Sequence, residues 1–247
     1  MSGTRELVVG VLGGMGPAAT LDLVAKVLEA TGARSDQEHL HILVDCNPKV
    51  PNRNEAVAGT APSPAPVLAA MARRLEAAGA DFLVMACNTA HAFEEAIRAA
   101  VGIPFVSILE ETVAEVAALV PEGARCGVLA AGGCRRARLY ERALEAADRV
   151  PVVLDAAHQE RFMDLLYRIK AGEQDAPVRA AMAGLAGELV GQGAELVIAG
   201  CTEVPLVLAA TDLTVPLVDS TRALARATVA YARHARPLPP AGPRAAR

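Results

Sequence analysis

The chain has 247 residues, of which 53% are apolar and 21% are charged, so it can bury a core and is not a disordered polymer. Its net charge of −4 and its aromatic content of 3% exclude the basic, base-stacking surface of a nucleic-acid-binding protein. No apolar stretch reaches the ~18 to 20 residues that a membrane span needs, and the first residues lack a signal-peptide pattern, so we expect a cytoplasmic protein without membrane or nucleic-acid partners.

Short apolar runs typical of β-strands alternate along the chain with longer segments of helical period. The strand-like runs are residues 7–12, 39–45, 81–86 and 103–108 in the first half, and 124–130, 150–155, 194–200 and 215–220 in the second. Two clear helical segments in the first half are residues 19–32 and 66–79. Because the central runs are apolar on both faces, the pattern predicts parallel strands covered by helices, hence an open α/β sheet.

The two halves of the chain are similar to each other. Residues 79–87, GADFLVMAC, align without a gap on residues 193–201, GAELVIAGC, and each half continues into a strand-like run opened by proline. Such a repeat predicts two similar α/β units. It places Cys87 and Cys201 at equivalent carboxyl ends of parallel strands, which is where open sheets bind ligands.

Paired cysteines at these positions indicate proton chemistry. A thiol between a strand end and a helix start lies near free N–H groups and the positive end of the helix dipole, and both favour the thiolate. One such cysteine would more often be a small buried hydrophobic residue, but two at matched positions favour function. If the halves face each other across a cleft, the thiols flank one ligand from opposite sides, as a 1,1-proton transfer requires.

The remaining cysteines give no sign of a metal or a disulfide framework. The total is five, an odd number, and no CxxC pair is present, so we expect no zinc site. Cys46 and Cys126 lie in or beside strand-like runs and are expected in the core, whereas Cys134 is interpreted as a loop thiol. His91, in the MACNTAH motif, is expected to be structural.

Four motifs in order carry a resemblance to a known family. They are GVLGGMGPAAT at 10–20, NPKVPNRN at 47–54, MACNTAH at 85–91 and AGCTEVPL at 199–206. Together they resemble the aspartate/glutamate racemase family, which works without pyridoxal phosphate, and the resemblance runs from about residue 7 to residue 232. It implies two similar open parallel-sheet α/β domains related by a pseudo-twofold, with the active site in the cleft between them.

The resemblance also assigns site residues. It implies Cys87 and Cys201 as the catalytic acid/base pair, and as substrate-binding residues Met15, Gly16, Arg53, Asn88, Thr89, Lys170, Thr202 and Glu203. Small polar side chains such as Asn88, Thr89 and Thr202 suit the α-carboxylate and ammonium of an amino acid, and Arg53 and Lys170 suit a distal carboxylate. Glu203 either orients groups around Cys201 or caps a helix. No cofactor is implied, and GGMG lacks the dinucleotide-binding spacing.

We expect a first domain of residues 1–112 with 216–234 and a second domain of residues 113–215. Residues 235–247 are rich in Pro and Arg and have no apolar period, so we expect a disordered tail there. The resemblance implies a homodimer and a small amino-acid substrate. The chain departs from the family at Asn52, where an aspartate is usual, and at Ala131, Cys134 and Ala137, where hydroxyls are usual. These changes bear on the identity of the substrate.

The leading hypothesis is racemisation of aspartate or glutamate by proton transfer between two cysteines. One alternative is a decarboxylase or a cis-trans isomerase of a small diacid, since an isomerase also can use two thiols. Another is a catalytically idle protein that binds small acids, because two α/β lobes around a cleft also describe solute receptors.

Overall fold

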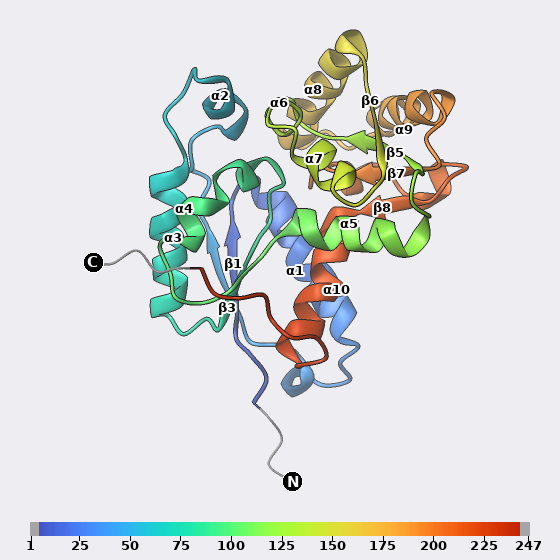
Figure 1. Ribbon diagram of the computed structural model, residues 1–247. Helices are drawn as coiled ribbons and strands as arrows, with labels where there is room; N and C mark the ends of the chain where they lie inside the picture. The colour runs from blue at the N-terminus through green and yellow to red at the C-terminus, as the bar shows by residue number, and fades with distance from the viewer. Residues whose placement is uncertain (1–4, 243–247) are drawn as a thin grey trace.

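The computed structural model describes residues 5–242, and within this range the chain forms two four-stranded parallel sheets (Figure 1). The first sheet has the order β2-β1-β3-β4, with β1 Val9–Gly13, β2 Ile42–Cys46, β3 Phe82–Met85 and β4 Phe105–Val106. The second has the order β6-β5-β7-β8, with β5 Arg125–Leu129, β6 Val150–Val153, β7 Leu196–Ala199 and β8 Leu217–Asp219. All eight strand-like runs contain a strand, and the shared strand order confirms the predicted pair of α/β units.

Helices connect the strands in both halves. Those of the first half are α1 Pro17–Thr31, α2 Arg53–Ala58, α3 Ala65–Ala77, α4 Glu94–Arg98 and α5 Ile108–Leu119. Those of the second half are α6 Gly132–Arg136, α7 Leu139–Glu145, α8 Ala156–Lys170, α9 Ala176–Gly191 and α10 Ser220–Ala232. Single 3₁₀ turns are η1 Asp36–Glu38, η2 Thr89–Phe93, η3 Val204–Leu206 and η4 Ala210–Asp212. Between residues 5 and 242, no helix has both the length and the apolar character to cross a membrane.

Local sequence explains where helix α1 begins and ends. Pro17 stands in its first turn, where the missing N–H of proline costs no hydrogen bond. The helix ends at Gly32, which adopts a left-handed φ of 59° and donates its N–H to the carbonyl of Glu29. The start of α1 therefore follows the Gly loop after β1 directly, which brings that loop to the carboxyl edge of the first sheet.

The last helix of each half packs on the other half. Helix α5 follows the first sheet but contacts α7, while α10 follows the second sheet and contacts α1 and α5. Figure 1 shows α1 and α10 side by side below α5, with the second sheet above. One apolar core cluster accordingly contains side chains from both sheets, among them Phe82 and Ile198. The two halves are thus joined by a shared core.

The packing of each last helix on the opposite half bears on the predicted domain boundary after residue 215. Strand β8 pairs with β7, with Ile198 opposite Val218, so residues 217–219 belong to the second sheet by their hydrogen bonds. Helix α10, which follows β8, packs on α1 of the first half. Residues 216–234, expected as one piece of the first domain, thus combine a strand of the second sheet with a helix that packs on the first half.

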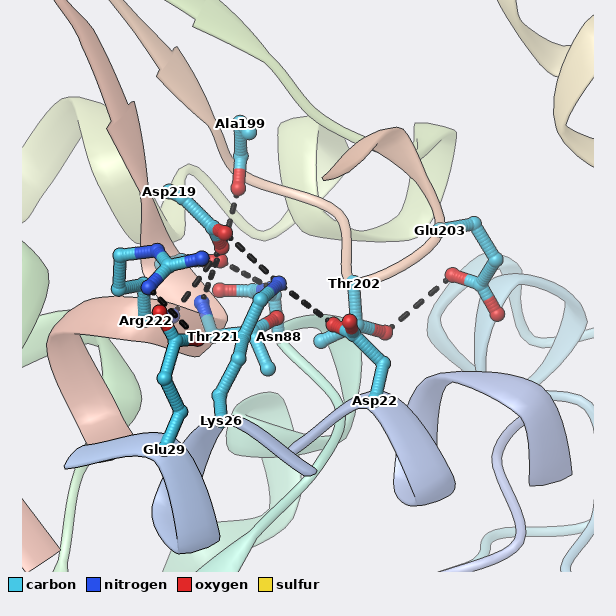
Figure 2. Close-up of polar contacts among 11 residues, drawn as sticks. Asp22, Lys26, Glu29, Asn88, Ala199, Thr202, Glu203, Asp219, Thr221 and Arg222 are labelled. Atoms are coloured by element: carbon cyan, nitrogen blue, oxygen red, sulfur yellow. Dashed lines mark hydrogen bonds and ion pairs between the residues drawn. The ribbon is translucent and has the colours of Figure 1, made fainter. Parts of the chain in front are cut away.

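A buried ion cluster ties α1 to the end of β8 (Figure 2). The ammonium of Lys26 on α1 pairs with Asp22 at 2.6 Å and with Asp219 at 2.7 Å. Asp219 also caps α10, because its other oxygen accepts the backbone N–H groups of Thr221 and Arg222. Burial raises the pKa of Asp22, although the hydrogen bond from Lys26 opposes that shift. The cluster thereby joins a helix of the first half to a strand of the second sheet.

Two expectations change in the structure. Residues 235–242, expected to be disordered, make contacts: Arg236 pairs with Glu111 at 2.6 Å, and Leu238 packs against the shared core. Residues 243–247 of the expected tail lie outside the described residues. Cys46, expected in the core, is exposed, because it ends the edge strand β2, which has a neighbouring strand on one side only. Cys126 is buried as expected.

Candidate active site

A small pocket lies where the carboxyl ends of the two sheets face each other. Cys87 follows β3 by two residues and Cys201 follows β7 by two residues, so the repeat places them at matched positions. The cavity volume of the pocket is about 20 Å³, room for about one water molecule, so side chains nearly fill it. Its lining residues are Met15, Arg53, Asn54, Cys87, Asn88, Thr89, Ala131, Leu166, Lys170, Cys201, Thr202 and Glu203.

The structure brings together the residues that the sequence singled out. Nine of the ten expected site residues line this pocket, and the tenth, Gly16, borders it, since a Cβ there would lie 3.4 Å from Glu203 Oε1. The additional lining residues are Asn54, Ala131 and Leu166. Leu166 lies one helical turn before Lys170 on α8. The helical period places both on one face, so the expected position of Lys170 could have indicated Leu166 as well.

Glu203 is the centre of the polar contacts around Cys201. The thiol of Cys201 donates to Glu203 Oε2 at 3.1 Å. Figure 2 shows that the hydroxyl of Thr202 donates to the same oxygen, at 3.3 Å. The other oxygen, Oε1, forms an ion pair with Lys170, the last residue of α8. Glu203 therefore orients groups around the thiol, which was one of its two expected roles.

These neighbours have opposing effects on acidity. Burial raises the pKa of Cys201 well above its usual value, and Glu203 raises it further, while Lys170 and the backbone N–H of Glu203 lower it. For Lys170, burial lowers the pKa, but Glu203 and Cys201 raise it more, so the net shift is upward. Lys170 therefore keeps its positive charge beside the thiol, and that charge favours loss of the thiol proton.

Cys87 has a different environment. It is 6% exposed, and within residues 5–242 its sulfur makes no hydrogen bond. Its carbonyl oxygen accepts a hydrogen bond from His91 Nδ1 at 2.8 Å, and His91 Nε2 accepts the backbone N–H of Ile108 at 3.2 Å. Burial lowers the pKa of His91 to about 4, so the ring stays neutral and serves the backbone, as expected of a structural histidine.

Arg53, the first residue of α2, brings a second cation to the pocket. Its Nη1 donates to the carbonyls of Val50 and Pro51 at 3.0 Å each, and its Nη2 donates to the carbonyl of Met15 at 3.3 Å. Its Nε is buried and, among the described residues, has no partner. Since a buried N–H without an acceptor is costly, this nitrogen is available to a ligand that supplies one.

Helices α2 and α6 are in contact beside the pocket. Asn54 Oδ1 accepts the backbone N–H of Gly133 at 2.9 Å. A Cβ at Gly133 would lie 2.8 Å from Thr89 Cγ2 and 2.9 Å from Asn54 Cα, so only glycine permits this approach. The contact joins the two halves on the side of the pocket away from α1 and α10.

The departures from the family pattern have separate locations. Asn52 caps α2, where its side chain accepts the backbone N–H of Asn54 at 3.0 Å. Ala131 lines the pocket, whereas Cys134 is fully buried in α6, and burial raises the pKa of its thiol. The neighbouring Arg135 pairs with Glu141 at 3.1 Å. The charge of Arg135 is thus already balanced by a carboxylate of its own half.

The fold and the facing cysteines define a class of two-domain amino-acid racemases. Residues 12–228 match the family model described as Asp/Glu/Hydantoin racemase, so the chain belongs to this family and is an amino-acid racemase, an isomerase. This membership favours the racemase hypothesis over the decarboxylase, the cis-trans isomerase and the idle binding protein.

Individual relatives support this assignment. The broad specificity amino-acid racemase RacX of Bacillus subtilis is 28% identical over 226 residues, which cover 90% of this chain and 96% of that protein. The aspartate racemase structure of Picrophilus torridus has a TM-score of 0.82 at 25% identity and covers 92% of this chain and 94% of that chain. Glutamate racemase RacE1 of Bacillus anthracis, at 21% identity, has a TM-score of 0.64 and covers 97% of this chain and 87% of that chain, which shows a shared fold.

Proposed function

We propose that this racemase acts on an acidic amino acid, aspartate or glutamate, by moving a proton between Cys87 and Cys201 without pyridoxal phosphate. The observation that carries the proposal is the pocket itself, which is lined by both thiols and by one cation from each half, Arg53 and Lys170. Two cations suit a substrate that carries two carboxylates.

The chemistry starts from a thiolate on one side of the substrate and a thiol on the other. The resemblance assigns Cys201 to the L-enantiomer: its proton passes to the Glu203 carboxylate, with which it is hydrogen-bonded, and the thiolate then takes the α-proton. The planar carbanion receives a proton from the Cys87 thiol on its opposite face, which yields the D-enantiomer and a Cys87 thiolate. After the product leaves, Glu203 releases its proton to solvent and the Cys87 thiolate takes one from solvent, which restores the starting state. The same steps in reverse convert the D-enantiomer into the L-enantiomer.

The carbanion needs electrostatic support while it exists. The hydroxyls of Thr89 and Thr202 and the amide of Asn88 line the pocket next to the two cysteines and are the groups we assign to the α-carboxylate and ammonium. Arg53 offers its unpartnered Nε, and Lys170 its ammonium, to the distal carboxylate. Fixed donors of this kind lower the barrier because they do not reorient during the reaction.

One incubation in D₂O tests the function and the mechanism together. Purified protein without added cofactor is given L-aspartate, L-glutamate or L-alanine, and α-deuterium in each enantiomer is followed by NMR after chiral separation. We expect deuterium to appear first in the D-enantiomer, because the returning proton comes from a thiol that has exchanged with solvent. Early labelling of both enantiomers would indicate a single base. Equal rates for alanine and the two acids would contradict the acidic specificity.

We also propose that the protein is a homodimer, as the resemblance implies. Light scattering coupled to size exclusion measures the mass in solution. A mass near twice the 25.5 kDa of the chain is the expected result, and a mass near one chain contradicts it.

A further inference from the structure

Tyr140, on helix α7 of the second half, is a fully buried side chain that does not line the pocket. Its hydroxyl donates a hydrogen bond to Asn88 Oδ1 at 2.6 Å. Asn88 directly follows Cys87 and belongs to the first half. A side chain of one half thus holds the residue next to the catalytic cysteine of the other.

The hydrogen bonds continue from Asn88 toward the second cysteine. Asn88 Nδ2 donates to Ser220 Oγ at 3.2 Å, and the hydroxyl of Ser220 donates to the carbonyl of Ala199 at 2.7 Å (Figure 2). Ala199 ends β7, two residues before Cys201. In all three hydrogen bonds the donor lies on the Tyr140 side and the acceptor on the side of Cys201. Hydrogen bonds linked in series in this way strengthen one another.

The ring of Tyr140 reaches the same backbone by direct contact. A Cβ at Gly200, the residue just before Cys201, would lie 2.7 Å from Tyr140 Cε2 and 3.1 Å from Cδ2. The ring therefore packs against Gly200, and glycine is what allows it to come so close. Burial raises the pKa of Tyr140, so its hydroxyl keeps its proton and remains a donor across the working pH range.

We propose that Tyr140 is a positioning residue that sets the separation and orientation of the two catalytic thiols. Its hydroxyl fixes Asn88 beside Cys87, and its ring fixes Gly200 beside Cys201. This role rests on the proposed function, since it matters only if both thiols act on one substrate. Two-base transfer is sensitive to such positioning, because a shift of about 1 Å can cost about 100-fold in rate.

The Tyr140→Phe variant tests the proposal, because it keeps the ring against Gly200 and removes only the hydroxyl. We expect kcat to fall about 10- to 100-fold in both directions, with a smaller change in KM. The matched control is Tyr231→Phe, which also removes a buried tyrosine hydroxyl, here one that donates to Glu111 at 2.7 Å away from the pocket. The control should show a similar loss of Tm with kcat unchanged.

A second measurement needs no substrate. Alkylation of Cys87 by iodoacetamide is followed by peptide mass spectrometry in the wild type and both variants. Tyr140→Phe should speed alkylation of Cys87 about 5-fold or more, because one lost buried hydrogen bond favours local opening of this loop by about that factor. Tyr231→Phe should leave the rate unchanged.

The two measurements separate the possible failures. If Tyr140→Phe leaves both kcat and the alkylation of Cys87 at the level of the Tyr231→Phe control, the positioning role is wrong. If the wild type racemises neither acid, the proposed function is wrong. Tyr140 is then judged by the alkylation rate alone, and an unchanged rate overturns its role.

Discussion

The two halves of this protein share their backbone and differ in the chemistry around their cysteines. Cys87 and Cys201 follow equivalent strands, and each half adds one cation to the pocket. The Cys201 thiol is hydrogen-bonded to the carboxylate of Glu203, which Lys170 neutralises. The half with Cys87 instead holds that residue through its backbone carbonyl, by way of His91. The repeat therefore explains the symmetry of the pocket, and single side chains explain its asymmetry.

That difference suits a reaction with two mirror-image substrates. In the proposed reaction the two thiols exchange proton donor and acceptor roles, and their polar contacts differ. Because a carboxylate lies beside only one of the thiols, different neighbours set the pKa of each thiol. The following predictions, from the largest expected effect to the smallest, test how far the halves are equivalent.

The most severe changes are Cys87→Ser and Cys201→Ser. Each should reduce racemisation by about 10²- to 10⁴-fold, because a serine hydroxyl is too weak an acid to exchange protons near neutral pH. Circular dichroism of L- and D-aspartate measures the rate from both sides. The exposed Cys46→Ser variant is the control and should keep full activity. Full activity in Cys87→Ser or in Cys201→Ser would show that racemisation does not need a cysteine from each half.

The next largest effect concerns the cation of the first half. Arg53→Ala should cost about 2 to 5 kcal/mol in kcat/KM for aspartate and glutamate, as expected for a charge-assisted pair in a desolvated site. Alanine, which has no distal carboxylate, should lose much less. Arg53 also donates to the carbonyls of Val50, Pro51 and Met15. The alternative outcome is therefore that the substitution disorders the loops that carry these carbonyls. An equal loss on all three amino acids would indicate that outcome.

The carboxylate and the cation of the second half should have opposite effects on Cys201. Glu203 raises the pKa of Cys201, so Glu203→Gln should lower it and move alkylation of Cys201 to lower pH. Lys170 lowers that pKa, so Lys170→Gln should raise it and move alkylation to higher pH. Peptide mass spectrometry across a pH series measures both, with Cys46 as the internal standard. Shifts in the same direction would contradict this electrostatic account.

The smallest expected effect is none. Dialysis against a chelator, and work without pyridoxal phosphate, should leave the rate of racemisation unchanged, because thiols and fixed donors carry out the proton transfer. The rate before and after dialysis is the measurement. If dialysis abolished the activity and a metal restored it, racemisation would depend on a metal and this prediction would be wrong.

Much of this architecture could be predicted from local patterns. The apolar runs identify all eight strands, because burial on both faces requires continuous apolar sequence. The gapless match of residues 79–87 with 193–201 predicts that both cysteines stand at equivalent strand ends. Arg53 and Lys170 were harder to choose among 24 basic residues, and only the resemblance to a family selected them.

Other features could not be predicted, because they depend on contacts between distant segments. Strand β8 joins the second sheet while the next helix packs on the first half, and no periodicity separates a strand from the helix that follows it. The exposure of Cys46 follows from its edge strand, a property of strand order rather than of sequence. Tyr140 carries no motif, and its contact with Asn88 spans 52 positions.

The sequence by itself determined the repeated α/β units and the matched cysteines, because strand burial and helical period are local patterns that a chain displays residue by residue. Only the tertiary structure decided how the halves exchange their last helices and that Glu203 contacts Cys201 and Lys170 at once. It also decided that Tyr140 contacts both Asn88, next to Cys87, and Gly200, next to Cys201. The physical reason is that hydrogen bonds and ion pairs depend on distances of about 3 Å between side chains, which packing alone sets.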